Sequence, residues 1–334
     1  MRAILSRLPI DPFILLLLGT VALATLLPAR GLGAVLAGHA VTVAIALLFF
    51  LYGARLAPQA ALAGARNVRL HGVVFLSTFA LFPALGLTAR ALAPHLLTPE
   101  LWAGVLLVCA LPSTVQSSIA FTSIARGNVP AALCAATLSN LVGVLLTPVL
   151  AGLLLSGGHG GISASTIGDI VLQLLLPFAL GQAVRPWLGT WAERNRRVLG
   201  FVDRGSILLV VYAAFSEGMV AGIWHQLDLA MLARLALLDG ALLAAVLVIT
   251  TQLSRRLGFS RADEITIVFC GSKKSLASGL PIASVMFPAA SVGLIVLPLM
   301  LFHQLQLMVC AALARRYAND GSPGRIAPIR PVAA

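Results

Sequence analysis

Long apolar segments, separated by short loops that carry arginine, run the length of this chain. Ten of them are about 20 residues long or more, the length at which an α-helix crosses a bilayer. They cover residues 11–28, 33–56, 70–92, 100–125, 129–155, 165–187, 203–223, 229–255, 262–287 and 290–314. Only 10% of the 334 residues are charged, against about 25% in soluble domains. The sequence therefore predicts an all-α polytopic membrane protein with ten transmembrane helices.

The placement of arginine predicts the orientation of these helices. Arg30, Arg90 and Arg234 fall in loops on one side, and the other 18 arginines fall on the opposite side together with both termini. Basic loops remain in the cytoplasm, so we expect a multi-pass protein of the plasma (inner) membrane with both termini cytoplasmic. Because the net charge of +12 follows this loop pattern, the lipid bilayer is the expected partner, and a nucleic acid is not.

Ten helices with both ends on one side divide into two halves of five with opposite orientation. We expect a first repeat at 1–156, a second, inverted repeat at 157–316, and a disordered cytoplasmic tail at 317–334. Helix four of each half contains a polar interruption, LPSTVQSS at 111–118 and GSKKS at 271–275. Paired interruptions in inverted repeats are the best sequence indication of a transporter's binding site.

Oxygen-bearing side chains and two lysines occupy these interruptions. The candidate ligands are Thr114, Gln116, Ser117 and Ser118 in the first, and Ser272 and Ser275 in the second. Lys273 and Lys274 lie near the middle of their span, where a lysine costs on the order of 3 kcal/mol. Two interpretations remain open: a lysine binds an anionic substrate or acts as a built-in cation, or the pair is structural and caps a half-helix.

Other polar residues within the spans are weaker candidates. His303 and Gln306 share one helix face, and Asn140 lies in helix five; each is equally consistent with an interhelical hydrogen bond or with ligand contact. Asp239 in helix eight is a candidate partner for one of the lysines. The four cysteines have no metal-ligand spacing, so we expect no metal site and no cofactor.

The sequence resembles the bile acid:sodium symporter family, in particular its sodium/bile acid symporter-like branch. The resemblance is carried by CALPSTVQSSIAFTSIARGN at 109–128, GSKKSLASGLP at 271–281 and FHQLQL at 302–307, with shorter matches over most of the chain. It implies ten helices in two inverted repeats. Helices 1, 2, 6 and 7 would form a panel, the other six a core, and broken helices 4 and 9 would cross at the ion sites.

The family's sodium ligands do not all have a counterpart here. The resemblance places the family's helix-nine glutamate at Cys270 and a nearby glutamine at Lys274, and its helix-five hydroxyl ligands at Ala132 and Ala136. Its helix-three glutamine falls at Thr78. Since cations repel one another strongly in a buried site, we expect a lysine ammonium to replace sodium. Sodium coupling is then doubtful, and a proton exchanged by a buried lysine is a possible coupling ion.

These features favour a secondary transporter that moves a small organic anion, bile-acid-like or otherwise amphipathic, by alternating access. The alternative is a non-transporting or regulatory membrane protein that keeps the symporter fold. The sequence has neither an HExxH motif nor a nucleophile elbow, so we do not expect an enzyme.

Overall fold

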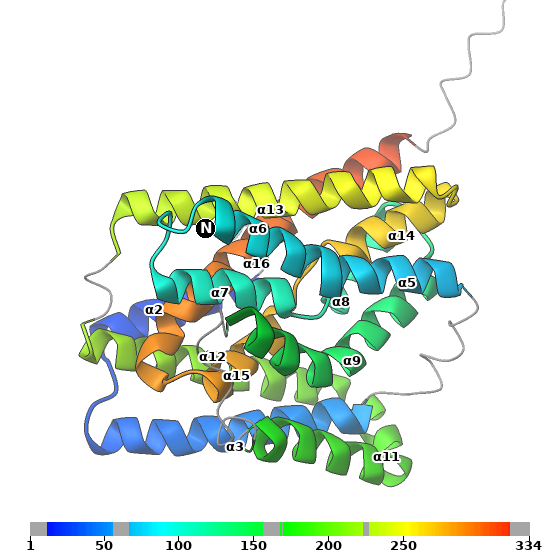
Figure 1. Ribbon diagram of the computed structural model, residues 1–334. Helices are drawn as coiled ribbons and strands as arrows, with labels where there is room; N and C mark the ends of the chain where they lie inside the picture. Colours follow the sequence, from blue (N-terminus) through cyan, green and yellow to red (C-terminus); the bar gives the residue numbers. More distant parts are fainter. Residues whose placement is uncertain (1–11, 56–66, 156–167, 169, 223–226, 321–334) are drawn as a thin grey trace, which may run out of the picture.

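A computed structural model describes residues 12–55, 67–155, 168, 170–222 and 227–320, and every regular element in these ranges is helical. The first half contains α2 (Pro12–Leu26), α3 (Leu32–Arg55), α5 (Val68–Leu76), η1 (Ser77–Leu81), α6 (Phe82–Leu92), α7 (Pro99–Ala110), α8 (Gln116–Ile124) and α9 (Val129–Leu155). The second half contains η2 (Val171–Leu175), α11 (Leu176–Arg194), α12 (Arg196–Val220), α13 (Leu229–Arg256), α14 (Arg261–Gly271), α15 (Leu276–Met286) and α16 (Ala289–Asp320). Figure 1 shows these helices running roughly along one direction.

Seven helical stretches within the described ranges are long and apolar enough to cross a membrane. They are Leu32–Arg55, Val68–Leu92, Val129–Leu155, Val171–Arg194, Arg197–Val220, Leu229–Arg256 and Ala289–Asn319. The remaining apolar helices are shorter. Helix α2 has 15 residues. In the other two segments a break divides the helix, between α7 and α8 and between α14 and α15. The prediction of an all-α polytopic membrane protein is confirmed.

Two predicted boundaries are wrong. The segment between the sixth and seventh predicted spans is almost entirely helical, because α11 continues to Arg194 and α12 begins at Arg196. Trp187 stands at the start of this extension and Trp191 lies within it. Both are exposed, and aromatic residues of this kind favour the membrane interface. The predicted tail begins too early, since α16 continues to Asp320; residues 321–334 lie outside the described residues.

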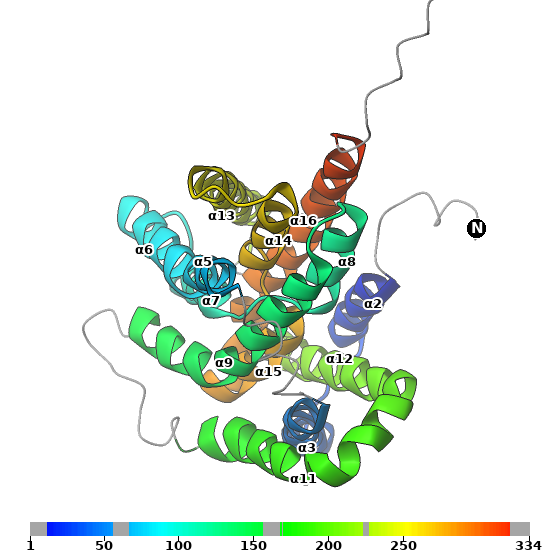
Figure 2. The same cartoon turned by 90° about the vertical axis from the view of Figure 1, so that its right-hand side faces the viewer.

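The helices pack in two groups (Figure 2). Helices α2, α3, α11 and α12 lie together on one side, with α3 packed along α11 and α12 packed against both α2 and α3. The second group consists of α5 to α9 and α13 to α16. It is joined to the first mainly through contacts of α12 with α15 and α16. Through α12 the first group contacts α15, which is one half of the second broken segment.

Close approach of α3 and α11 depends on two glycines. A Cβ atom added to Gly53 would overlap the carbonyl oxygen of Phe178, and one added to Gly181 would overlap that of Phe50. Small residues at a crossing let helix backbones come together in a membrane, where packing drives association. The pair therefore fixes how the first group is assembled.

Candidate functional site

The first break, between α7 and α8, is held by side chains of α9. Thr147 Oγ1 donates to the carbonyl of Ala110 at 3.0 Å, and Asn140 Nδ2 donates to that of Ser113 at 2.6 Å. The Ser113 amide in turn donates to Ser139 Oγ at 3.0 Å. Backbone groups freed by a break need partners, because hydrocarbon supplies none. Helix α9 supplies them, which explains why Asn140 lies inside an apolar helix.

The second break, between α14 and α15, meets the first directly. The Ser275 amide donates to the carbonyl of Pro112 at 2.9 Å, and Ser118 Oγ donates to that of Phe269 at 3.2 Å. Ser275 is also the N-cap of α15, accepting the amide of Ser278 at 3.2 Å. The two polar interruptions, more than 150 residues apart in sequence, therefore form one hydrogen-bonded crossing.

Lys274 is fully buried at this crossing, and its ammonium group is bound by three backbone carbonyls. Nζ donates to Thr78 at 2.8 Å, to Cys109 at 2.9 Å and to Leu111 at 2.8 Å. The ring centroid of Phe82 lies 4.1 Å from Nζ. An ammonium has three N–H groups, so all three are used, and the ring face adds a cation–π contact. Lys274 therefore fills a carbonyl cage much as a metal cation would.

Local backbone irregularity makes this cage possible. Thr78 lies in the π-helical turn η1, and Cys109 and Leu111 lie where α7 ends. Carbonyl groups in such positions are not fully used by the helix. Helix C-terminal ends also carry partial negative charge, which favours a cation.

Gln306 holds the backbone of Lys274 in place. Its Oε1 accepts the Lys274 amide at 2.8 Å, and its Nε2 donates to the Lys274 carbonyl at 2.9 Å. His303 Nδ1 lies 2.8 Å from the same Nε2. Gln306 of α16 therefore makes an interhelical hydrogen bond with the break between α14 and α15, which is one of the two interpretations of its sequence position.

Lys273 points to a different environment. Its Nζ donates to the carbonyl of Ser117 at 2.7 Å and lies 4.0 Å from the ring centroid of Phe121 and 5.3 Å from that of Phe269. This side chain is also fully buried. The two adjacent lysines therefore have unequal environments, one with three carbonyl partners and one with a single carbonyl and two rings.

The hydroxyls of the first break lie close to one another. Thr114 Oγ1 is 2.6 Å from Ser117 Oγ and 3.3 Å from Ser118 Oγ. Gln116, the first residue of α8, is exposed, whereas Ser272 at the end of α14 is fully buried. The structure thus brings most of the predicted residues to one crossing and leaves Gln116 at its edge.

Two sequence expectations differ from the structure. Asp239 forms no ion pair with either lysine, since its carboxyl oxygens have no hydrogen-bond partner among the described residues and the Lys274 ammonium is already satisfied by carbonyls. Thr78 contributes its main-chain oxygen, because its hydroxyl donates to the carbonyl of Val74. Sequence reasoning did not identify Cys109, Leu111 and Phe82, since every residue has a carbonyl and phenylalanine is common in apolar helices.

Ala132 and Ala136, where the resemblance placed the family's helix-five ligands, and Cys270, where it placed the helix-nine glutamate, are fully buried. Ala132 and Cys270 belong to one buried cluster with Leu70, Val74, Ala131, Ala135 and Ile267. The Cys270 thiol donates to the carbonyl of Ala132 at 3.8 Å. The side chains of Ala132 and Cys270 carry no oxygen atom.

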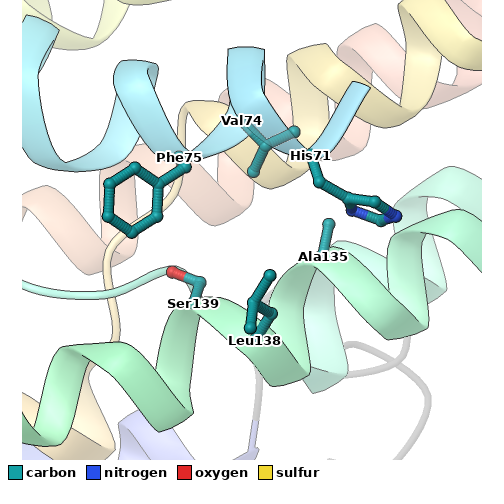
Figure 3. A pocket seen from close by; sticks show the side chains of 6 residues that line it. All are labelled: His71, Val74, Phe75, Ala135, Leu138 and Ser139. Atoms are coloured by element: carbon teal, nitrogen blue, oxygen red, sulfur yellow. The ribbon is translucent and has the colours of Figure 1, made fainter. Parts of the chain in front are cut away.

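Two pockets among the described residues are not lined by either lysine. One lies between α5 and α9 and is lined by His71, Val74, Phe75, Ala135, Leu138 and Ser139 (Figure 3). Its volume of about 10 Å³ is at the limit for one water molecule. A larger hollow of about 280 Å³ lies between α3 and α11, beside Arg55 and Arg185. The first pocket is too small for an organic anion, and the second is remote in sequence from both breaks.

Comparison with known proteins decides the family. The sequence pattern of the SBF-like CPA transporter family matches residues 11–319. The chain belongs to this family. Its relatives include an uncharacterized protein of Pseudomonas aeruginosa, 57% identical over 310 residues, 92% of this chain and 93% of the relative. Another, named "Putative symporter YfeH" in Escherichia coli, is 52% identical over 311 residues, 93% of this chain and 94% of that protein.

A more distant relative is the mouse sodium/bile acid cotransporter 7. It is 27% identical over 275 residues, 81% of either chain. The resemblance to the bile acid:sodium symporter family is thereby confirmed, and the family consists of transporters, not enzymes. This protein is accordingly a secondary transporter of the membrane.

Proposed function

We propose that this transporter moves a small organic anion without the sodium ions used by its family, and that Lys274 takes the place of one of those ions. The observation that carries the proposal is the set of three carbonyls, from Thr78, Cys109 and Leu111, that binds the Lys274 ammonium where the two breaks meet. A permanent ammonium satisfies the broken helix ends continuously. Sodium would have to be bound anew in every cycle.

Electrostatics argue against sodium beside this group. Two unit charges 4 Å apart repel by about 4 kcal/mol at an effective dielectric constant of 20. Lys273 adds a second buried ammonium in the same crossing. The apolar cluster around Ala132 and Cys270 offers no side-chain carboxylate or hydroxyl in exchange.

The positive charge that remains for a substrate is that of Lys273. Its ammonium has one carbonyl partner among the described residues, Ser117, and the hydroxyl of that residue lies 2.6 Å from that of Thr114. Lys274, with its N–H groups occupied, is unsuited to substrate binding. An anionic group that approaches the edge of α8 therefore meets hydroxyls, N-terminal amides of α8 and the field of Lys273.

The proposal includes the finer architecture expected from the sequence. It assigns ten spans to two inverted repeats, at 1–156 and 157–316, with α2, α3, α11 and α12 as the panel and the remaining helices as the core. Alternating access would come from movement of one group against the other along the contacts of α12. Both termini would lie in the cytoplasm of a cell whose inner membrane holds the protein. The packing of the helices in two groups supports this division.

Uptake by proteoliposomes containing the purified full chain tests the proposal. The probe is radiolabelled taurocholate, chosen because distant relatives are named for sodium and bile acid. We expect equal uptake with external sodium and with sodium replaced by choline, and loss of uptake in Lys273→Gln. Uptake that requires sodium contradicts the built-in cation, and absence of taurocholate uptake under both conditions contradicts the bile-acid-like substrate class.

A further inference from the structure

Asp239 is a carboxyl group buried inside the bundle that the lysine site does not use. It lies near the middle of α13 and is completely inaccessible to solvent. Neither of its carboxyl oxygens has a hydrogen-bond partner among the described residues. The surrounding face of α13 is otherwise apolar, with Leu235, Leu242, Leu243 and Val246 buried beside it.

An ionised carboxylate is the least stable form for such a position. Burying a charge away from water is costly unless it is paired or hydrogen-bonded. Protonation removes the charge, because the carboxylate takes a proton from water and forms an O–H bond. The group therefore carries a proton in the conformation described here. Intramembrane carboxyl groups are rare and commonly mark ion pathways.

The neighbourhood of Asp239 fits a proton better than a metal ion. Among the described residues no group of three or more His, Cys, Asp or Glu side chains gathers to hold a metal. A hard cation needs several oxygen ligands, whereas Asp239 has not even one polar partner in the described ranges. A proton requires only the carboxyl itself.

Few titratable groups can act on Asp239. The elements packed against α13 are α14, α16, α6 and η1. The titratable residues nearest the level of Asp239 on these elements are Cys270 from α14, His303 and Cys310 from α16, and Arg90 from α6; η1 has none. The Cys109 thiol at the end of α7 also lies within electrostatic range of both Asp239 and Lys274. The other charged groups of α14 and α16 include Glu264 and Arg261, which meet Arg255 and Tyr317 at the far end of α13, about 24 Å of helix rise away.

Neither lysine is suited to exchange a proton. Lys274 uses three N–H groups on three carbonyls, and loss of one proton would leave a buried carbonyl without a donor. Lys273 is held over two aromatic rings, contacts that favour its charged form. Loss of a proton from either lysine would break these contacts, whereas gain or loss of a proton at Asp239 breaks no hydrogen bond among the described residues.

We propose that Asp239 is the proton-binding site of this transporter, and that the proton it binds and releases is the coupling ion. The assignment of the proton to coupling rests on the proposed function. In the conformation described here the carboxyl O–H bond is intact. When the helices around α13 separate and water enters, that bond breaks, the proton passes to water, and the carboxylate is stabilised by water and by the field of Lys274. Rebinding of a proton precedes the return to the dry state.

Infrared difference spectroscopy of the full chain in lipid nanodiscs tests the proton site without any substrate. The wild type should show the C=O stretch of a protonated carboxylic acid at neutral pH. Asp239→Asn should abolish this band, and Asp239→Glu should retain it at a shifted position. The matched control is Asp263→Asn, which removes a carboxyl at the start of α14 that accepts from Asn128 and should leave the band unchanged. A wild type without the band, or a band that survives in Asp239→Asn, overturns the proposal.

A transport measurement then tests coupling. A proton gradient, acidic outside, should drive taurocholate uptake by the wild type, whereas Asp239→Asn should lose gradient-driven uptake and keep exchange between labelled and unlabelled taurocholate. Gradient-driven uptake that persists in Asp239→Asn overturns the coupling role. If the band behaves as expected but taurocholate is not transported at all, the proton site stands and the proposed substrate class fails, so the two failures are distinguishable.

Discussion

Replacing Lys274 by methionine removes the cation from the carbonyl cage and keeps an unbranched side chain that is one atom shorter. The change leaves the carbonyls of Thr78, Cys109 and Leu111 without their donor. A buried polar group left unsatisfied costs about 1–3 kcal/mol, so three acceptors cost about 3 kcal/mol at the lower limit. The change also removes the free-energy cost of burying a charge. The effect of the carbonyls is therefore measured best against a variant that removes the same cost.

Lys273→Met is that matched control. It removes an ammonium buried to the same extent from the neighbouring position, but it frees only the carbonyl of Ser117. The relief of desolvation is similar in both variants, so their difference reports the two additional carbonyls, about 2 kcal/mol. At roughly 2 °C per kcal/mol for a chain of this size, we expect Lys274→Met to melt about 4 °C below Lys273→Met.

Thermal unfolding of the purified variants in one detergent, followed by intrinsic fluorescence, measures this difference. A second arm uses Lys274→Ala, which leaves the cage open: ammonium chloride should raise its Tm, and choline chloride at the same concentration should not, because a ligand that binds the native state stabilises it. Equal melting temperatures for the two methionine variants, or a more stable Lys274→Met, would refute the argument that the carbonyls require a cation.

Two further predictions concern the scaffold of the site. Gly53→Ala should lower stability by about 1–3 kcal/mol, because its Cβ would overlap the Phe178 carbonyl. Gly72→Ala, whose added Cβ meets no atom of another helix within 4 Å, should melt no lower than the wild type. Equal losses would contradict the role of the helix crossing. Asn140→Leu frees the Ser113 carbonyl and should lower both Tm and taurocholate uptake in proteoliposomes, and normal uptake would show that α9 does not hold the break.

Much of the helical architecture follows from local sequence. A run of apolar residues of bilayer length has few alternatives to a helix, because lipid supplies no hydrogen-bond partner for the backbone. For the same reason the polar stretches at 111–118 and 271–275 identified the breaks, which the structure has between Ala110 and Gln116 and between Gly271 and Leu276. The extension of α11 to Arg194 was missed, since hydropathy reports where a helix leaves the apolar layer and not where it ends.

The candidate site was less accessible to sequence reasoning. Side-chain oxygens could be identified at Ser117, Ser118 and Ser275, but the main partners of Lys274 are main-chain carbonyls, which every residue possesses. Asp239, a candidate partner for a lysine, does not pair with Lys274, because an ammonium satisfied by three carbonyls has no N–H group left for a carboxylate. The charge of each residue was evident, but the partner that would neutralise it was not.

The sequence by itself determined that this chain lies in a membrane as a set of helices, that two of them are interrupted, and that two ammonium groups stand at the second interruption. Hydropathy and charge are properties of single residues, and they do not depend on how the chain folds back on itself. Only the tertiary structure decided that Lys274 is enclosed by Thr78, Cys109 and Leu111 while Lys273 faces Ser117 and two rings. Adjacent residues of a broken helix point in different directions, and the segments that receive them come from elsewhere in the sequence.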